Sequence, residues 1–316
     1  MDHRFSSWIL GAIAAVVLGC APPRAAAQDL CAPSEATDPQ PQHINGAKTF
    51  TYKKVGEVEL RLYVFNSAAH APDHRVPAVV FFYGGGFLFG DIRRYQAQAT
   101  HLALRGLVTV LVDYRVKCRH GSVIMDSIAD GKSAMRWVRG HAAQFGIDPA
   151  RIAAVGSSAG GLMAAANALV TDFDDPADPR IDPRPNALVL YNPALDMASP
   201  LAIQHLTAHW GKAVADRAHD FSPMEHLDRG LPPTIIFQGT ADKGVSPASV
   251  EEFCRRARVP KTQCEVVLYP GAPHGFTEIW LGLDDPVTFP KTEFWASDTS
   301  RRTDAFLTRL GWLTAR

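Results

Sequence analysis

The stretch that decides the fold is AAVGSSAGGLMAA, residues 153–165, in which an apolar run meets an Ala-rich, helix-forming run. Gly156, Gly160 and Gly161 surround Ser158 at the junction. Glycine weakens both a strand and a helix, so three of them at one junction need a physical reason. The junction is either a tight packing corner or a sharp turn that presents the serine, and features elsewhere in the chain distinguish the two.

Buried-strand patterns recur on both sides of this junction. Continuous apolar runs that end in turn residues are typical of parallel strands covered on both faces, and they occur at 76–82, 107–112, 151–156, 187–191, 233–237 and 264–269. Helical patterns separate or follow them at 93–106, 125–146, 247–258 and 298–310, and residues 48–66 alternate in polarity like a hairpin. The alternation predicts an α/β protein with a mostly parallel sheet, helices on both faces and right-handed crossovers.

Two segments do not follow this alternation. Residues 28–48 are rich in Pro, Asp and Gln and predict an irregular N-terminal arm. Residues 196–228 place polar, helical material between two strands, which indicates a small cap-like insertion within one domain spanning 49–316. The composition is ordinary for a globular protein, and the formal net charge of zero argues against a nucleic-acid partner.

The first 27 residues have the order of a secretory signal peptide. Arg4 precedes the apolar run from Trp8 to Leu18, and AAA at 25–27 precedes Gln28 as a small-residue cleavage site. The run is too short for a membrane-spanning helix, which needs about 20 residues, and no later stretch is long and apolar enough. We therefore predict an exported protein, periplasmic or secreted. VLGC at 17–20 leaves an alternative open, an outer-membrane lipoprotein anchored through Cys20.

Four of the five cysteines follow this segment. An even number in an oxidising compartment is compatible with disulfides, although sequence alone does not give their connectivity. The local pair Cys254–Cys264 would close the turn between a helix and the next strand, which leaves Cys31–Cys118 to tie the arm to the body. The sequence contains no Cys-x-x-Cys spacing of the kind that binds zinc. We therefore expect neither a metal nor a cofactor.

Gly156 to Gly160 form a Gly-x-Ser-x-Gly motif at a strand-to-helix junction. A serine on such a turn is held in a strained backbone conformation with its hydroxyl exposed beyond the sheet edge, and larger flanking side chains would clash. The helix that follows directs its positive N-terminal end at the same point. Ser158 is therefore the candidate nucleophile.

A second glycine cluster, Gly84 to Gly86, follows the strand at 76–82. No Gly-Lys-Ser/Thr follows it, which argues against a phosphate-binding loop. Free backbone N–H groups at a strand end suit an oxyanion hole, where each donor contributes about 3–4 kcal/mol in the transition state. We expect the donors to be the N–H groups of Gly85, Gly86 and Ala159.

A serine hydroxyl needs a base, and the base needs an orienting partner. Asp242 follows the strand at 233–237, and His274 lies in a Gly/Pro-rich loop after the strand at 264–269. Each alone has an ordinary explanation, since loop histidines are commonly solvated and aspartates form turns. The order Ser158, Asp242, His274 is the one found for a nucleophile, orienting acid and base on this kind of sheet.

These residues carry a family resemblance. YGGGF, DYR, GIDPARIAAVGSSAGG, GTADKGV and YPGAPHGF resemble the α/β-hydrolase superfamily, and more narrowly the hormone-sensitive-lipase-like, bacterial family IV carboxylesterases, over about residues 55–312. The resemblance implies an eight-stranded, mostly parallel sheet, a cap over the site and hydrolysis of carboxylic esters. Tyr83 stands where that family has a histidine that braces the glycine loop, so we expect activity with altered loop packing. YRVKCRHGS replaces the family's YRLAPE, which leaves substrate preference open.

The sequence thus predicts an exported serine carboxylesterase that acts through an acyl-enzyme on short-chain esters, including acetyl or feruloyl esters of plant polysaccharide. A noncatalytic ligand-binding relative and a serine peptidase of the prolyl-oligopeptidase type are the alternatives. The latter usually carries a large propeller domain, for which this chain has no room. His205 and His209 are spaced for a metal on one helix face, but HLTAH lacks the Glu of a zinc protease, so we assign them to the cap surface.

Overall fold

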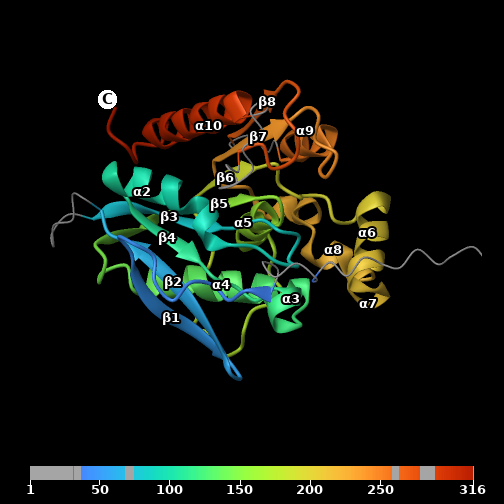
Figure 1. Ribbon diagram of the computed structural model, residues 1–316, viewed down its shortest axis with the longest axis horizontal. Helices are drawn as coiled ribbons and strands as arrows, with labels where there is room; N and C mark the ends of the chain where they lie inside the picture. Colours follow the sequence, from blue (N-terminus) through green and yellow to red (C-terminus); the bar gives the residue numbers. More distant parts are fainter. Residues whose placement is uncertain (1–30, 32–36, 68–74, 258–262, 278–288, 316) are drawn as a thin grey trace, which may run out of the picture.

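The structure of the protein is a computed structural model that describes residues 31, 37–67, 75–257, 263–277 and 289–315. The predicted signal peptide, its cleavage site and Cys20 therefore lie outside the described residues. An eight-stranded sheet runs through the molecule in the order β1-β2-β4-β3-β5-β6-β7-β8 (Figure 1). β2 pairs antiparallel with both neighbours, and all pairs from β4 to β8 are parallel. The predicted mostly parallel eight-stranded sheet is confirmed.

The strands follow the apolar runs of the sequence. They are β1 Lys48–Val55, β2 Val58–Phe65, β3 Val76–Phe82, β4 Val108–Val112, β5 Ile147–Ser157, β6 Ala187–Tyr191, β7 Thr234–Gly239 and β8 Cys264–Tyr269. Every residue of β3, β4, β6 and β7 is buried. Burial on both faces explains why these strands are continuously apolar, whereas the hairpin strand β1 keeps one polar face.

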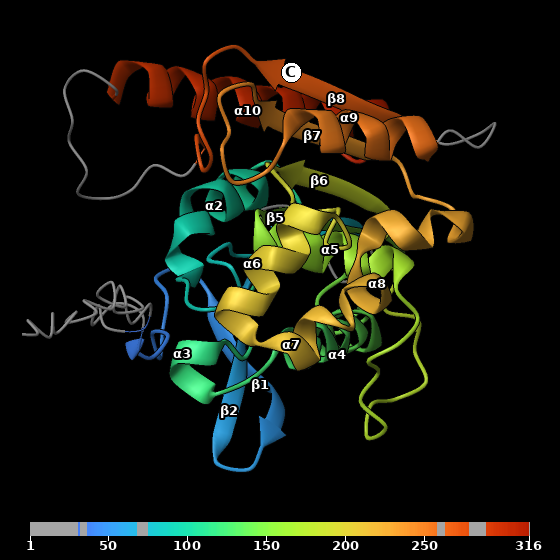
Figure 2. The same cartoon turned by 90° about the vertical axis from the view of Figure 1, so that its right-hand side faces the viewer.

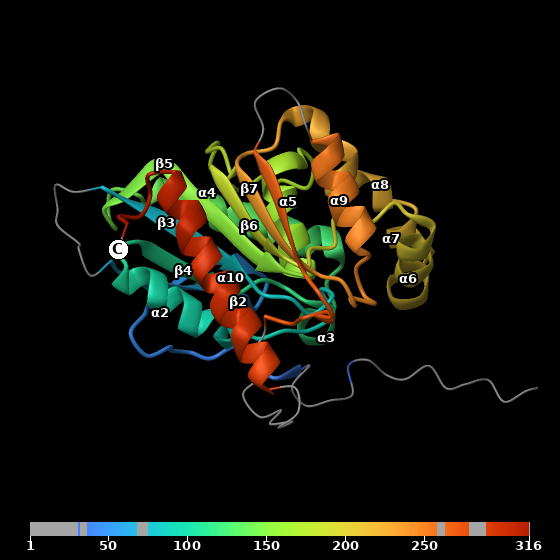
Figure 3. The same ribbon diagram turned by 90° about the horizontal axis from the view of Figure 1, so that it is seen from above.

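The helices form two layers and a group at one sheet edge. Their bounds are η1 Ile92–Tyr95, α2 Gln96–Leu104, α3 Lys117–His120, α4 Ile124–Gly140, α5 Ala159–Leu169, α6 Pro200–Trp210, α7 Lys212–Ala215, α8 Ala218–Phe221, η2 Pro223–Arg229, α9 Pro247–Arg256 and α10 Phe289–Arg309. α2 and α10 cover one face of the sheet, and α4, α5 and α9 cover the other (Figure 3). Burial of both sheet faces produces one continuous hydrophobic core.

The segment predicted as a cap forms α6, α7, α8 and η2 between β6 and β7. α6 and α7 lie over the edge at which the parallel strands end (Figure 2). α6 also contacts α3, because the ammonium group of Lys117 donates to the carbonyl of His209 at 2.5 Å and lies 5.1 Å from the Trp210 ring centroid. The insertion is thereby anchored to the body at its end nearest α3.

Two helix boundaries differ from the sequence prediction. α4 ends at Gly140 rather than at 146, and the residues after it form turns. α10 begins at Phe289, nine residues before the predicted start. Pro290 occupies its first turn, a position that proline tolerates because its missing N–H has no intrahelical acceptor there.

Two disulfides connect segments of the described chain. Cys254 at the end of α9 is bonded to Cys264 at the start of β8, and Cys31 is bonded to Cys118 in α3. These are the two pairs expected from the sequence. None of the helices in the described part of the chain is both long and apolar enough to cross a membrane.

Candidate active site

Ser158 occupies the turn between β5 and α5 in a backbone conformation that few residues other than glycine adopt. Its φ of 53° and ψ of −117° lie in a strained region for an L-residue. The backbone N–H of Ser158 donates to the carbonyl of Tyr191 at 2.9 Å, and its own carbonyl accepts from Leu162 and Ala194. Bonds to β6 and α5 hold this conformation, so the strain is maintained by the surrounding fold.

The three glycines around Ser158 are explained by contacts that leave no space for a side chain. A Cβ atom on Gly156 would lie 2.1 Å from the carbonyl oxygen of Gly160, and one on Gly160 would lie 2.0 Å from that of Phe82. A Cβ atom on Gly161 would lie 2.6 Å from the Cβ of Pro193. The junction is therefore a tight packing corner and a sharp turn at once, because close packing of β5, α5 and β3 creates the turn that carries the serine.

The structure brings Ser158, His274 and Asp242 together from three loops at the same sheet edge. Nε2 of His274 lies 2.9 Å from Oγ of Ser158, and Nδ1 lies 2.8 Å from Oδ2 of Asp242. The carboxylate of Asp242 is fully buried, whereas the His274 side chain is 35% exposed. The imidazole thus bridges a buried charge and a hydroxyl that solvent can reach.

The hydrogen bonds around Asp242 determine the tautomer of His274. Oδ1 accepts from the backbone N–H groups of Gly244 and Val245, each at 2.8 Å, and Oδ2 accepts from Nε2 of Gln238 at 3.0 Å. Burial raises the pKa of Asp242, but hydrogen bonds from His274, Val245 and Gln238 outweigh burial and lower the pKa below its ordinary value. An ionised carboxylate only accepts, so Nδ1 carries the proton and Nε2 of the neutral ring accepts from Ser158.

Gln238 was not singled out in the sequence. It is fully buried in β7, four residues before Asp242, and its amide also donates to the carbonyls of Gly239 and Val245. The available signal was a lone amide side chain in the apolar run TIIFQG, since a buried polar group needs partners.

The glycine loop, defined as Gly84 to Gly90, follows β3 at the same edge of the sheet as Ser158. Gly85 and Gly86 have φ values of 125° and 64°, and a Cβ atom on Gly85 would lie 2.2 Å from the carbonyl oxygen of Phe89. Among the residues that the structure describes, none accepts a hydrogen bond from the backbone N–H of Gly85, Gly86 or Ala159. These are the three donors expected from the sequence, and Ala159 opens α5, whose first N–H groups have no intrahelical acceptor.

Tyr83, at the position of the family's histidine, is fully buried immediately before the glycine loop. Its ring stacks on Tyr114 with centroids 4.1 Å apart, and each tyrosine hydroxyl donates to the backbone carbonyl of the other. The Tyr83 hydroxyl also accepts from the guanidinium group of Arg119 at 2.9 Å. The tyrosine pair therefore connects β3 to the end of β4 through a different set of contacts than an imidazole could make.

Two other places, a histidine pair on α6 and a cavity at the far end of the sheet, do not form a binding site. His205 and His209 lie on α6 with ring centroids 4.3 Å apart, but no group of three metal-ligating side chains occurs within the described ranges. A cavity of about 620 Å³ lies at the opposite end of the sheet, before β6 and β7. Its half-buried Arg139 already donates to the carbonyls of Pro149, Asp182 and Arg184, so this side chain holds loops together.

Comparisons with known proteins agree on one family. The BD-FAE family model matches residues 65–256, more than half of the chain. The apo structure of Thermogutta terrifontis esterase 2 is 37% identical, with a TM-score of 0.76, and the match covers 87% of this chain and 98% of that one.

Two curated relatives come from Mycobacterium tuberculosis. Esterase LipC is 28% identical over 65% of this chain and 54% of its own length, and carboxylesterase NlhH is 30% identical over 55% and 54%. This chain spans about half the length of the curated relatives it matches. The sheet order, the serine turn and these similarities lead to one conclusion: the chain belongs to the BD-FAE family and has the α/β-hydrolase fold.

Proposed function

We propose that this protein is a serine hydrolase that cleaves carboxylic esters through an acyl-enzyme. The observation that carries the proposal is the unbroken hydrogen-bonded series from Ser158 through His274 to Asp242, with distances of 2.9 and 2.8 Å. A nucleophile, a base and an orienting acid in that geometry are what acyl transfer by serine requires. Similarity to proteins described as esterases supports the same reaction.

The first half-reaction uses the tautomer that Asp242 imposes. Oγ of Ser158 attacks the ester carbonyl carbon while Nε2 of His274 takes the hydroxyl proton. The carbonyl π-electrons move to oxygen, and the negative oxygen faces the N–H groups of Gly85, Gly86 and Ala159. Asp242 stays ionised and stabilises the imidazolium that forms.

Collapse of the tetrahedral intermediate completes the first half-reaction, and attack by water in the second then restores the enzyme. The tetrahedral intermediate collapses, the bond to the alcohol oxygen breaks, and His274 gives its proton to that oxygen, leaving an acyl group on Ser158. Water then attacks the acyl carbon while His274 takes one of its protons. Breakdown of the second intermediate releases the carboxylic acid and returns the proton to Oγ.

Short acyl groups are the substrates that we propose, with acetyl or feruloyl esters of plant polysaccharide as the natural form. Other structures of Thermogutta terrifontis esterase 2 are described as propionate-bound and butyrate-bound, and they are 37% and 36% identical to this chain. These acids support a preference for short chains. The match to the family model BD-FAE supports carboxylic esters as the general substrate class.

We expect acyl length to be decided by the side chains that surround Ser158. With p-nitrophenyl acetate, butyrate and octanoate, kcat/KM is expected to fall at least about tenfold from butyrate to octanoate, because even one misfitted methylene costs about 1–3 kcal/mol. The series also includes a p-nitroanilide of the preferred acid, which tests amide cleavage. Acetylated and feruloylated xylo-oligosaccharides test the proposed natural esters. Cleavage of the anilide alone would favour the peptidase alternative, and no cleavage of any compound would favour a binding protein.

Export is proposed on the order of residues 1–27 and is supported by the two disulfides, which persist in oxidising compartments. Expressed in a Gram-negative host with its full N-terminus, the protein is expected in the periplasm with Gln28 as its first residue. N-terminal sequencing and intact mass check this. A lipid on Cys20 would support the lipoprotein alternative, and an intact Met1 in the cytoplasm would contradict export.

A further inference from the structure

The glycine loop poses a physical problem for the proposed function. Gly85, Gly86, Phe87 and Gly90 all have positive φ values, at 125°, 64°, 60° and 146°. Glycines lose more backbone entropy on ordering than other residues. An oxyanion hole nevertheless requires donors that are fixed before the reaction begins. We therefore expect contacts from outside the loop to help fix its backbone conformation.

One set of external contacts comes from α3. The backbone N–H of Lys117 donates to the carbonyl of Phe87, and that of Cys118 donates to the carbonyl of Leu88, both at 2.9 Å. α3 has only four residues, none of them buried. A helix this short is not stable by itself, so other bonds must hold α3 in place.

Arg119 in α3 spans both ends of the glycine loop. Its Nη2 donates to the Tyr83 hydroxyl at 2.9 Å, immediately before the loop, and its Nη1 donates to the carbonyl of Gly90 at 2.8 Å, where the loop ends. A Cβ atom on Gly90 would lie 2.3 Å from Cδ2 of Tyr83, so the two ends are in direct contact. A planar guanidinium group is suited to this task because its donors have a fixed spacing.

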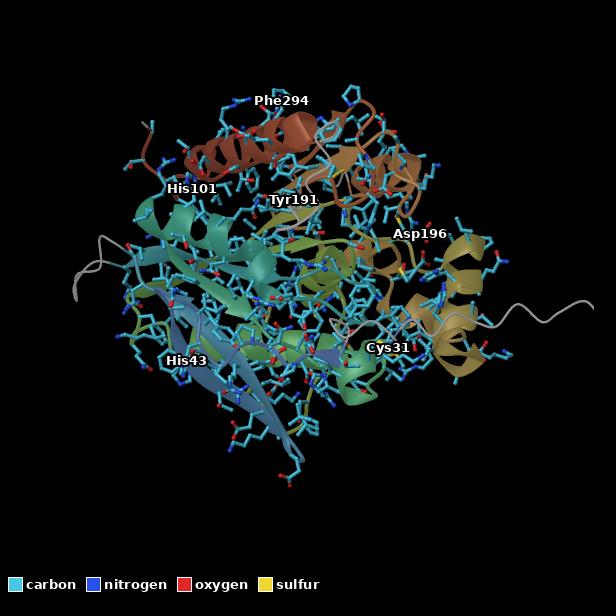
Figure 4. All side chains as sticks on the ribbon, in the orientation of Figure 1. Cys31, His43, His101, Tyr191, Asp196 and Phe294 are labelled. Atoms are coloured by element: carbon cyan, nitrogen blue, oxygen red, sulfur yellow. A yellow bond between two sulfur atoms is a disulfide. The ribbon has the colours of Figure 1, made fainter. Side chains whose placement is uncertain are left out.

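The N-terminal arm completes the arrangement. Gln40, which is 6% exposed, donates from Nε2 to the same Gly90 carbonyl at 2.8 Å and accepts from the backbone N–H of Ile92 at 3.2 Å. Nη1 of Arg119 also donates to the carbonyl of Asp38 at 3.3 Å. Cys31 is bonded to Cys118, the neighbour of Arg119, and lies beside α3 (Figure 4).

We propose that Arg119 is a positioning residue for the glycine loop and that the Cys31–Cys118 disulfide keeps it in place by fastening the arm to α3. The inference rests on the proposed function, in which the loop supplies oxyanion donors. Arg119 touches no reacting atom. It acts by joining Tyr83 to Gly90, and thereby holds the N–H groups between them in one orientation.

The first test is Arg119→Gln in the full chain. We expect kcat on p-nitrophenyl acetate to fall about tenfold or more with KM changed less than about threefold, because oxyanion donors act in the transition state. Amide exchange at Leu88 and Phe89, whose N–H groups donate to the Gly85 carbonyl, is expected to accelerate. Arg119→Lys is expected to recover part of both effects. Arg255→Gln is the matched control, since Arg255 pairs with Glu252 on the exposed surface of α9.

The second test compares the two disulfides. Cys31→Ser with Cys118→Ser is expected to lower kcat and accelerate exchange at Leu88 and Phe89, as Arg119→Gln does. Cys254→Ser with Cys264→Ser removes a disulfide that joins α9 to β8, and it is expected to lower Tm with kcat and loop exchange unchanged at 25 °C. This pair of variants decides the matter if Arg119→Gln does not fold.

Two results would overturn the inference. One is wild-type exchange at Leu88 and Phe89 in the variants that lack Arg119 or the Cys31–Cys118 bond. The other is faster exchange with unchanged kcat, which would make the contacts structural only. Exchange does not depend on turnover, so a wild-type protein that cleaves no ester would refute the proposed function and still leave the contacts open to measurement.

Discussion

Asp242→Asn is expected to lower kcat on p-nitrophenyl acetate about 10⁴-fold, the loss found when a buried orienting aspartate is replaced by its amide in enzymes with this type of catalytic group. The two side chains are nearly the same size, so the fold should survive. The effect arises from hydrogen-bond polarity, because an amide has a donor where the carboxylate had a second acceptor.

The contacts of Asp242 determine which way the amide turns. Oδ1 accepts from two backbone N–H groups, those of Gly244 and Val245, and Oδ2 accepts from His274 and Gln238. An amide nitrogen cannot face the two backbone donors, so it takes the position of Oδ2. His274 must then accept at Nδ1, and its proton moves to Nε2, which faces Ser158. The base loses the lone pair that it needs.

Steady-state kinetics and far-UV circular dichroism of both proteins check this result. Asp216→Asn is the matched control, because Asp216 forms an exposed ion pair with Lys212 on the cap. That control should keep wild-type kcat. A folded Asp242→Asn variant with kcat within about tenfold of wild type would show that His274 does not depend on this carboxylate for its tautomer.

Ser158→Ala is expected to lower kcat by at least about 10⁴-fold, leaving only the contribution of the oxyanion donors and of substrate binding. The hydroxyl is the only atom of the side chain that the mechanism uses. Alanine also fits the space, so the change removes the nucleophile with little change in packing.

The residual rate of p-nitrophenol release from the acetate ester measures this effect. Ser249→Ala provides the control, because Ser249 lies on α9 and its hydroxyl donates to the local carbonyl of Ser246. The control should match the wild type in both rate and stability. Equal turnover by wild type and Ser158→Ala would remove Ser158 from the mechanism.

The sequence was most informative where burial leaves few choices. Strands β3, β4, β6 and β7 are buried throughout, so each appears as a continuous apolar run and was predicted within one or two residues. The glycines around Ser158 were also informative, because a Cβ atom on Gly156 or Gly160 would lie 2.1 or 2.0 Å from a backbone carbonyl oxygen, and one on Gly161 would lie 2.6 Å from the Cβ of Pro193. The spacing of these glycines therefore predicted close backbone packing at the turn.

The three candidate site residues were predicted from their order and from their place after strands, and the structure brings them together. Carboxyl ends of parallel strands meet at one edge, so residues far apart in the chain become neighbours there. Distances and tautomer could not be predicted in this way. The two backbone donors to Asp242 and the amide of Gln238 depend on the path of a turn, which composition does not specify.

The contacts that hold the glycine loop could not be predicted from the sequence, because they join residues far apart in the chain. Arg119 and Gln40 are separated by 79 positions, and no periodic pattern connects them with Gly90. Both side chains donate to the same carbonyl because the fold brings the arm and α3 to the end of the glycine loop. Only the pairing of Cys31 with Cys118 suggested that the arm lies near this part of the body.

The central claim is that Ser158 is a nucleophile activated by His274, and covalent labelling tests it most directly. Paraoxon transfers its diethylphosphoryl group to an activated serine and releases p-nitrophenol, and one structure of Thermogutta terrifontis esterase 2 is described as phosphorylated by this compound. We expect one phosphoryl group per chain, located on Ser158 by peptide mass spectrometry, and none on Ser158→Ala. A wild-type protein that stays unlabelled, or carries the group on another residue, would contradict the account.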